Sequence, residues 1–88
     1  MVASNRPAAR KTFANELSRF LVLLAEMPET GRSYPHAQIP GLRRVLMPET
    51  KYHVYYVFDP IRTEVVVLAV WGSARERGPV LRPPRRIN

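Results

Sequence analysis

Apolar residues recur at helical spacing in the first third of the chain. Steps of one, three or four residues separate the members of this stripe, which are Phe13, Leu17, Phe20, Leu21 and Leu24. Pro7 suits the first turn of a helix, where a backbone N–H has no partner anyway, and Ser4 or Asn5 can cap it. Pro28 cannot continue the helix. The pattern predicts an amphipathic helix from about Pro7 to residues 25–27.

Three later segments have the composition of β-strands. They are residues 42–47, 52–58 and 64–71, and each is rich in β-branched, aromatic or other apolar residues. Connections of about four to five residues favour an antiparallel meander. Residues 65–70 are apolar on both faces, which predicts a central position for the third strand. Residues 28–41 contain three prolines and two glycines and are predicted to form a loop.

These elements predict an α+β fold with one N-terminal amphipathic helix packed on a three-stranded antiparallel sheet. Alternation places Tyr52, Val54, Tyr56 and Phe58 together on one sheet face. The opposite face, with His53, Tyr55 and Val57, is then expected to lie open and to invite a partner. We expect a single domain over residues 1–81 and a flexible basic tail over residues 82–88, where two adjacent prolines block a helix.

Charge and composition narrow the class of partner. The 88 residues include 14 Lys and Arg against 7 Asp and Glu, which gives a formal net charge of +7. Such a balance favours nucleic acid or an acidic protein as partner. No cysteine is present, and the two histidines lie 17 positions apart without a clustered acid, so we expect no metal site and no cofactor. The longest apolar run, residues 65–71, is too short to span a bilayer, and no secretory signal is visible, so a cytoplasmic protein is expected.

Four motifs occur in order between residues 8 and 81. They are L-A-E-M-P-E-T-G-R at residues 24–32, P-G-L-R-R at 40–44, Y-H-V-Y-Y-V at 52–57, and the apolar strand that ends in arginine at 65–75. Together they resemble the RelE/ParE superfamily of toxins from type II toxin–antitoxin systems, closer to the ParE-like branch. Members usually begin with a β-strand and a first helix. Since this sequence starts almost directly at what resembles the second helix, we expect it to lack both.

The resemblance implies a toxin of a plasmid stabilization system. ParE-like toxins inhibit DNA gyrase by binding rather than by chemistry, and a cognate acidic, ParD-like antitoxin neutralises them in a hetero-oligomer. The residues expected to contact partners are Arg43, Tyr55, Arg75 and Arg77.

Two alternatives remain open. RelE-like toxins are ribosome-dependent mRNA endoribonucleases, and alignment with their pattern places Arg44, His53 and Arg75 at catalytic positions. However, Leu46 and Leu81 stand where a lysine and a tyrosine are expected, so we do not expect an enzyme. The other alternative is a trimmed toxin that retains only antitoxin binding. His53 is also compatible with a structural or solvent-facing role, and arginines on an edge strand can simply block aggregation.

Overall fold

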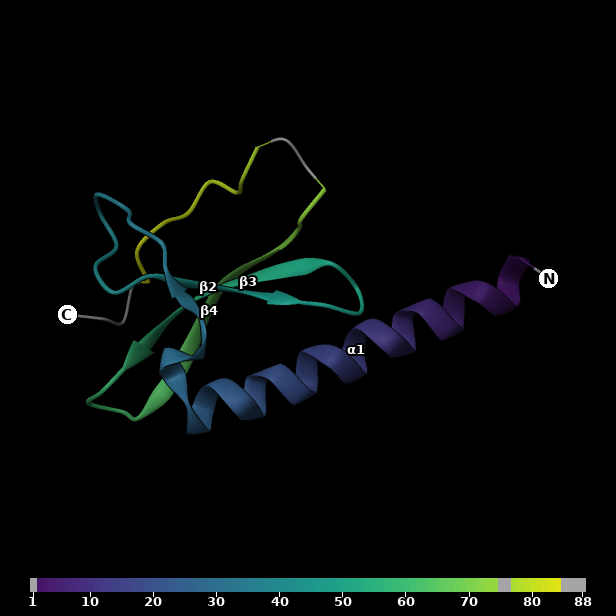
Figure 1. Cartoon of the computed structure of the whole chain (residues 1–88), viewed down its shortest axis with the longest axis horizontal. Helices are drawn as coiled ribbons and strands as arrows, with labels where there is room; N and C mark the ends of the chain where they lie inside the picture. Colours follow the sequence, from purple (N-terminus) through teal and green to yellow (C-terminus); the bar gives the residue numbers. More distant parts are fainter. Residues whose placement is uncertain (1, 75–76, 85–88) are drawn as a thin grey trace.

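A long helix lies along one face of an antiparallel sheet in the computed structural model, which describes residues 2–74 and 77–84 and the side chains from Lys11 onward (Figure 1). The elements are α1 (Val2–Glu26), the 3-10 turn η1 (Pro28–Thr30), β1 (Arg32–Ser33), β2 (Arg43–Met47), β3 (Tyr52–Asp59) and β4 (Glu64–Gly72). The N-terminal turns of α1 extend beyond the sheet. The predicted α+β class is confirmed. No helix in the described part of the chain is long and apolar enough to cross a membrane.

The helix starts earlier than predicted and ends where predicted. It begins at Val2 rather than near Pro7, since the residues before Pro7 include no glycine or proline that would stop it. It ends at Glu26, two residues before Pro28. The amide of Met27 still donates to the carbonyl of Leu23 at 2.7 Å, and η1 then turns the chain toward the sheet.

The sheet has four strands in the order β1-β2-β3-β4, and every neighbouring pair is antiparallel. Two predictions about it were wrong. The segment predicted as a loop contributes β1, because its prolines flank Arg32 and Ser33 and leave their backbone groups free to pair with β2. In addition, β4 is an edge strand rather than a central one, and β3 has neighbours on both sides.

A bulge in β4 explains why that strand is apolar on both faces. Tyr55 pairs with Ala69, whereas Tyr56 pairs with Val67, so Leu68 is an extra residue in β4. The extra residue shifts the alternation, and Val65 and Val70 therefore both pack on the side of α1. Val66, Leu68, Ala69 and Trp71 pack on the other side of the sheet.

One core cluster lies between α1 and the sheet. Its fully buried members are Leu24, Met47, Val54 and Tyr56. The predicted helical stripe supplies Phe13, Leu17 and Phe20 around them. The Phe13 ring also meets the Tyr52 ring edge-on at 5.1 Å. The predicted stripe is thus confirmed except for Leu21, which is 36% exposed, and the predicted inner face of β3 is confirmed for Val54 and Tyr56.

The opposite sheet face is covered, which contradicts the expectation that it lies open. Tyr55 and Val57 are only 2% and 4% exposed. Ile39 and Leu42 from the connection between β1 and β2, and Leu81 from the segment after β4, complete a second buried cluster with them. The prediction failed because apolar residues in irregular segments have no periodicity that assigns them to a face. Residues 85–88 of the predicted flexible tail lie outside the described residues, so the tail stays a prediction.

A group of hydrogen bonds centred on the Tyr56 hydroxyl joins the end of α1 to the sheet. The hydroxyl donates to the Pro28 carbonyl at 2.7 Å and accepts from the Gly31 amide at 2.9 Å. Arg43 donates to the Gly31 carbonyl at 2.6 Å. Burial raises the pKa of Tyr56, and the Gly31 amide and Arg43 offset this only in part, so the hydroxyl keeps its proton for Pro28. We refer to Pro28, Gly31, Arg43 and Tyr56 as the helix-exit lock.

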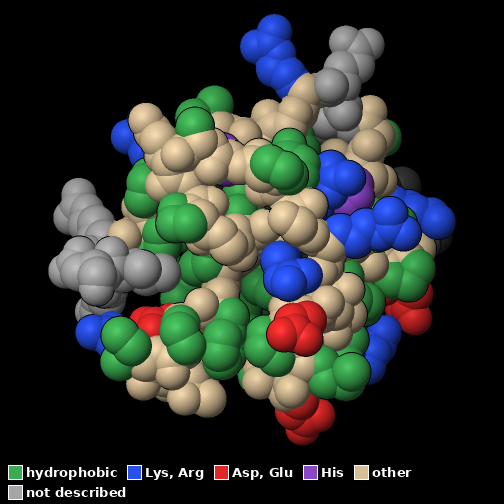
Figure 2. All heavy atoms as spheres, turned by 60° about the vertical axis from the view of Figure 1, so that its left-hand side comes forward, with side chains coloured by type: hydrophobic (Ala, Val, Ile, Leu, Met, Phe, Trp, Pro, Cys, Tyr) green, Lys and Arg blue, Asp and Glu red, His purple; other side chains and the backbone are tan. Residues whose placement is uncertain are grey.

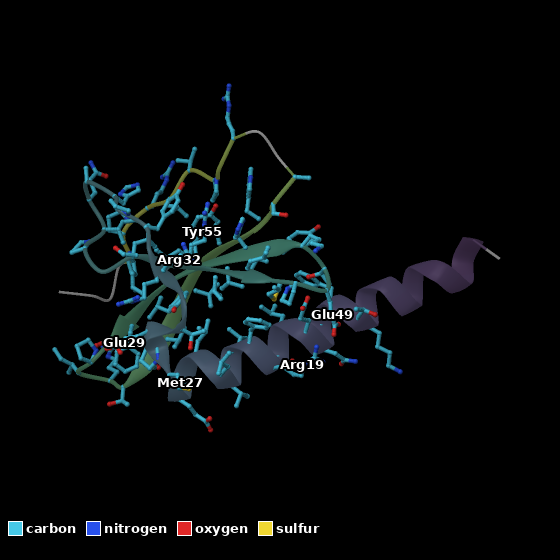
Figure 3. All side chains as sticks on the ribbon, viewed as in Figure 1. Arg19, Met27, Glu29, Arg32, Glu49 and Tyr55 are labelled. Atoms are coloured by element: carbon cyan, nitrogen blue, oxygen red, sulfur yellow. The ribbon has the colours of Figure 1, made fainter. Side chains whose placement is uncertain are left out.

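A buried carboxylate fixes the other end of the contact between α1 and the sheet. Glu16 is 1% exposed and accepts hydrogen bonds from the amides of Glu49 and Thr50 and from the Thr50 hydroxyl, at 2.7–2.9 Å. An exposed ion pair of 3.3 Å between Arg19 and Glu49 lies beside it (Figure 3). Desolvation raises the pKa of Glu16, but the hydrogen bonds outweigh it and the net pKa is lowered.

Replacing Gly31 with alanine should destabilise the fold by about 2 kcal/mol. A Cβ at Gly31 would lie 2.6 Å from the Tyr56 hydroxyl oxygen and 3.0 Å from the Arg44 carbonyl, so the lock must open. Gly78→Ala is the matched control, since the nearest atom to its Cβ, apart from its chain neighbours, would be the Tyr34 hydroxyl oxygen at 3.4 Å. The measurement is urea unfolding, and equal losses in the two variants would contradict the role of the lock.

Acidification should release the Glu16 contact. Folding lowers the pKa of Glu16. The stability that its ionised carboxylate contributes is therefore present above the ordinary pKa of 4.5 and is lost as pH falls through the lowered pKa of the folded state. Glu16→Gln should be less stable than the wild type at neutral pH, and the two should converge at acid pH. Unfolding midpoints measured across this range test the idea, and a difference that does not change with pH would refute it.

Candidate anion-binding site

Two arginines face each other across neighbouring strands on the sheet face opposite α1. Arg32 of β1 and Arg44 of β2 are direct ladder partners, so their side chains leave the sheet on the same side. Like charges in this position destabilise a sheet unless an anion lies between them. They line a depression of about 360 Å³ together with Thr30, Ser33, Tyr34, Val45, Leu46 and His53, and these described lining residues include no acid. The unbalanced positive charge makes this surface a candidate anion site.

His53 belongs to the same depression. It lies on β3 opposite Leu46 of β2 and lines the depression with Arg44. Burial lowers the pKa of His53, and the charge of Arg44 lowers it further, so the imidazole is predominantly neutral near pH 7. A neutral imidazole can accept a proton or donate a hydrogen bond beside the arginines.

An aromatic ring supports the Arg44 side chain. The Arg44 guanidinium lies over the Tyr34 ring, 5.0 Å from its centroid. The Tyr34 ring in turn meets the Tyr55 ring edge-on, with the ring centroids 5.2 Å apart. The ring centroids of His53 and Tyr55 are 6.2 Å apart. Trp71 donates its indole N–H to the Arg77 carbonyl at 2.7 Å, which holds the segment after β4 beside the same surface.

Figure 3 shows Arg32 and Tyr55 on one side of the sheet and the Arg19–Glu49 pair by α1 on the other. On the face seen in Figure 2, Lys and Arg side chains gather next to a histidine, with acidic side chains lower on that face. The basic site is therefore separate from the helix side of the molecule.

The predicted site residues divide between the two sides of the sheet. Four of them, Arg44, His53, Tyr55 and Arg77, line one pocket, although Tyr55 is buried and belongs to its floor. Arg43 points to the other face and bonds to Gly31, because alternate residues of a strand face opposite ways. Arg75 lies outside the described residues.

Sequence reasoning missed Arg32 and Tyr34. Both belong to the segment predicted as a loop, and nothing in their local sequence shows that Arg32 pairs with Arg44. The one available signal was that Arg32 directly follows Gly31 at the end of the motif at residues 24–32. Leu46 is 42% exposed beside His53, and Leu81 is buried in the core. Both side chains are hydrocarbons, so neither can transfer a proton.

The fold and the site define a small basic α+β domain that presents arginines without a compensating acid among its described lining residues. The chain belongs to the family of ParE toxins of type II toxin–antitoxin systems (parDE), whose family model matches residues 1–77. The predicted superfamily is thereby confirmed, and membership implies an antitoxin partner. No curated protein and no solved structure matched the chain.

Removing the charge of Arg44 should raise the pKa of His53 toward its ordinary value. Arg44→Gln takes away the coulombic contribution and leaves the larger effect of burial, so the recovery should be partial. Arg19→Gln, on the opposite side of the molecule, removes the same charge and should leave the His53 titration unchanged. Histidine resonances followed by NMR against pH provide the measurement, and identical curves for the wild type and Arg44→Gln would disprove the coupling.

Proposed function

We propose that this chain is a ParE-like toxin that inhibits DNA gyrase by binding, acts in the cytoplasm, and is neutralised by a cognate acidic antitoxin of the ParD kind. The observation that carries the proposal is the opposed pair Arg32 and Arg44 in a ParE-family chain of net charge +7. Such a surface attracts anionic protein or nucleic acid and orients it. The same charge favours an acidic antitoxin.

The composition of the site supports binding over chemistry. Of the positions that the RelE pattern assigns to catalysis, two carry Leu46 and Leu81, which can neither move a proton nor hold a phosphate. Arg44 and Arg32 can neutralise phosphate charge, but charge neutralisation alone does not cleave a phosphodiester.

One observation favours a nuclease as the second candidate. His53 is held in its neutral form beside Arg44, as a base that deprotonates a ribose 2′-hydroxyl would be. In that reaction His53 takes the 2′-hydroxyl proton, the 2′-oxygen attacks the phosphorus to form a cyclic phosphate, the arginines stabilise the added charge, and the 5′-oxygen leaves as a hydroxyl with a proton from solvent. A protein that retains only antitoxin binding is the third candidate.

The purified chain should inhibit DNA supercoiling by gyrase and leave ribosome-bound message intact. The double variant Arg32→Gln/Arg44→Gln should inhibit at least about tenfold more weakly, which corresponds to about 1.4 kcal/mol of binding. The matched control Arg19→Gln/Arg62→Gln removes two charges elsewhere and should retain inhibition. Circular dichroism checks that each variant is folded.

Two other results would replace this proposal. Cleavage of ribosome-bound message that is lost in His53→Gln would establish the nuclease. Activity in neither assay, together with tight binding of the antitoxin, would leave only the third candidate.

A further inference from the structure

The depression between Arg32 and Arg44 carries two positive charges that the described part of the chain does not balance. The two side chains leave β1 and β2 at paired positions, where like charges repel each other. The ion pairs among the described residues lie elsewhere and involve other arginines. A ligand that balances both charges would therefore remove a repulsion that is built into the sheet.

The same sheet face offers hydrogen-bond donors to such a ligand. The Arg44 guanidinium lies over the Tyr34 ring, which leaves the N–H groups at its edge for an anion. His53 lies on this face as well, since its ring is close to that of Tyr55, the ladder partner of Arg44. A neutral imidazole donates through one nitrogen. The described lining residues include no acid, so these groups favour an anion and repel a cation.

Charge decides which class of anion fits best. A carboxylate or a phosphodiester carries one negative charge and would leave one arginine unbalanced. A phosphomonoester carries about 1.5 to 2 negative charges at pH 7 and has three acceptor oxygens. A guanidinium can bind two of these oxygens at once. One phosphomonoester can therefore face Arg32 on one side and Arg44 on the other.

The depression has room for such a group and adjoins a second pocket. Its volume of about 360 Å³ lies at the lower end of the roughly 300–1,000 Å³ that is typical of small-molecule sites. Arg44 and His53 also line the neighbouring pocket of about 230 Å³, to which the segment after β4 contributes Ser73, Arg77 and Gly78. The organic group of a phosphate ester bound at Arg44 can extend into this pocket.

We propose that the depression is a phosphomonoester site, which binds the dianion of a small organic phosphate or of free phosphate between Arg32 and Arg44. His53 donates a further hydrogen bond, and the neighbouring pocket receives the organic group where there is one. This inference goes beyond the proposed function, because the ligand is a small molecule and neither gyrase nor an antitoxin is needed to bind it.

The test compares methyl phosphate, a monoester, with dimethyl phosphate, a diester, by NMR titration of the full chain at constant ionic strength. Methyl phosphate should bind at least about tenfold more tightly. It should also raise the pKa of His53, because a nearby dianion stabilises the imidazolium. Ribose 5-phosphate and inorganic phosphate then distinguish the sources. Tighter binding of the sugar phosphate supports an organic ligand, and equal binding supports free phosphate as the ligand of the same site.

The other charged and titratable side chains that line the depression and the pocket around His53 are Arg32, Arg44, Arg77, Tyr34 and Tyr55. All the charged ones are arginines, so a bound anion is the change that should move the His53 titration upward.

Arg32→Gln provides a second test that does not depend on a loss of folding. Without ligand, this variant should be at least as stable as the wild type, because the repulsion across the ladder is gone. It should bind methyl phosphate at least about tenfold more weakly. Methyl phosphate should raise the thermal unfolding midpoint of the wild type and leave that of Arg32→Gln nearly unchanged. The control Arg19→Gln removes the same charge beside α1 and should bind like the wild type (Figure 3).

Two results would overturn the inference. One is equal affinity for methyl phosphate and dimethyl phosphate, which would reduce the site to a general attraction for anions. The other is undiminished binding of methyl phosphate by Arg32→Gln. Neither gyrase nor an antitoxin is present in these experiments, so their failure is distinguishable from failure of the proposed function.

Discussion

The hydroxyl group of Tyr56 is the point on which the arrangement of helix, sheet and site depends. It bonds at once to the Pro28 carbonyl and the Gly31 amide, across 25 or more positions of sequence. The turn after α1 is thereby fixed against the middle of β3, and Arg43 fixes it against β2. β1 follows directly, and its two ladder pairs are too few to hold it alone. Without the helix-exit lock, Arg32 would have no fixed place opposite Arg44.

Periodicity was sufficient to predict the parts of the fold that repeat. The helical stripe around Leu24 and the alternation through β3 both gave the correct inner face. Periodicity failed for Ile39 and Leu81, which cover the second face from segments without regular structure. It also misjudged β4, because a strand covered on both faces by loops and a helix has the same composition as a strand with two neighbours.

The residues of the candidate site could be predicted from the sequence where they lie on regular strands, and not elsewhere. Arg44 and His53 lie on regular strands, and the resemblance to a toxin family identified both. Arg32 joins them only through the lock, so the alternation of strand residues could not reveal it. The neighbours Arg43 and Arg44 show how finely the strand alternation divides roles. Arg43 supports the turn after α1 and Arg44 faces the depression, although their sequence environment is nearly identical.

The covered second face changes the reason why this chain needs a partner. An open apolar face would require a broad, non-directional cover, but that face is closed by Leu42, Leu81 and their neighbours. What remains unbalanced among the described residues is directional: two arginines have charges that repel each other across a ladder. Counter-charges satisfy this requirement only when a partner places them in the correct geometry, whereas an exposed apolar surface could bind many partners. Directional requirements of this kind favour recognition of the toxin by its own antitoxin over binding of unrelated proteins.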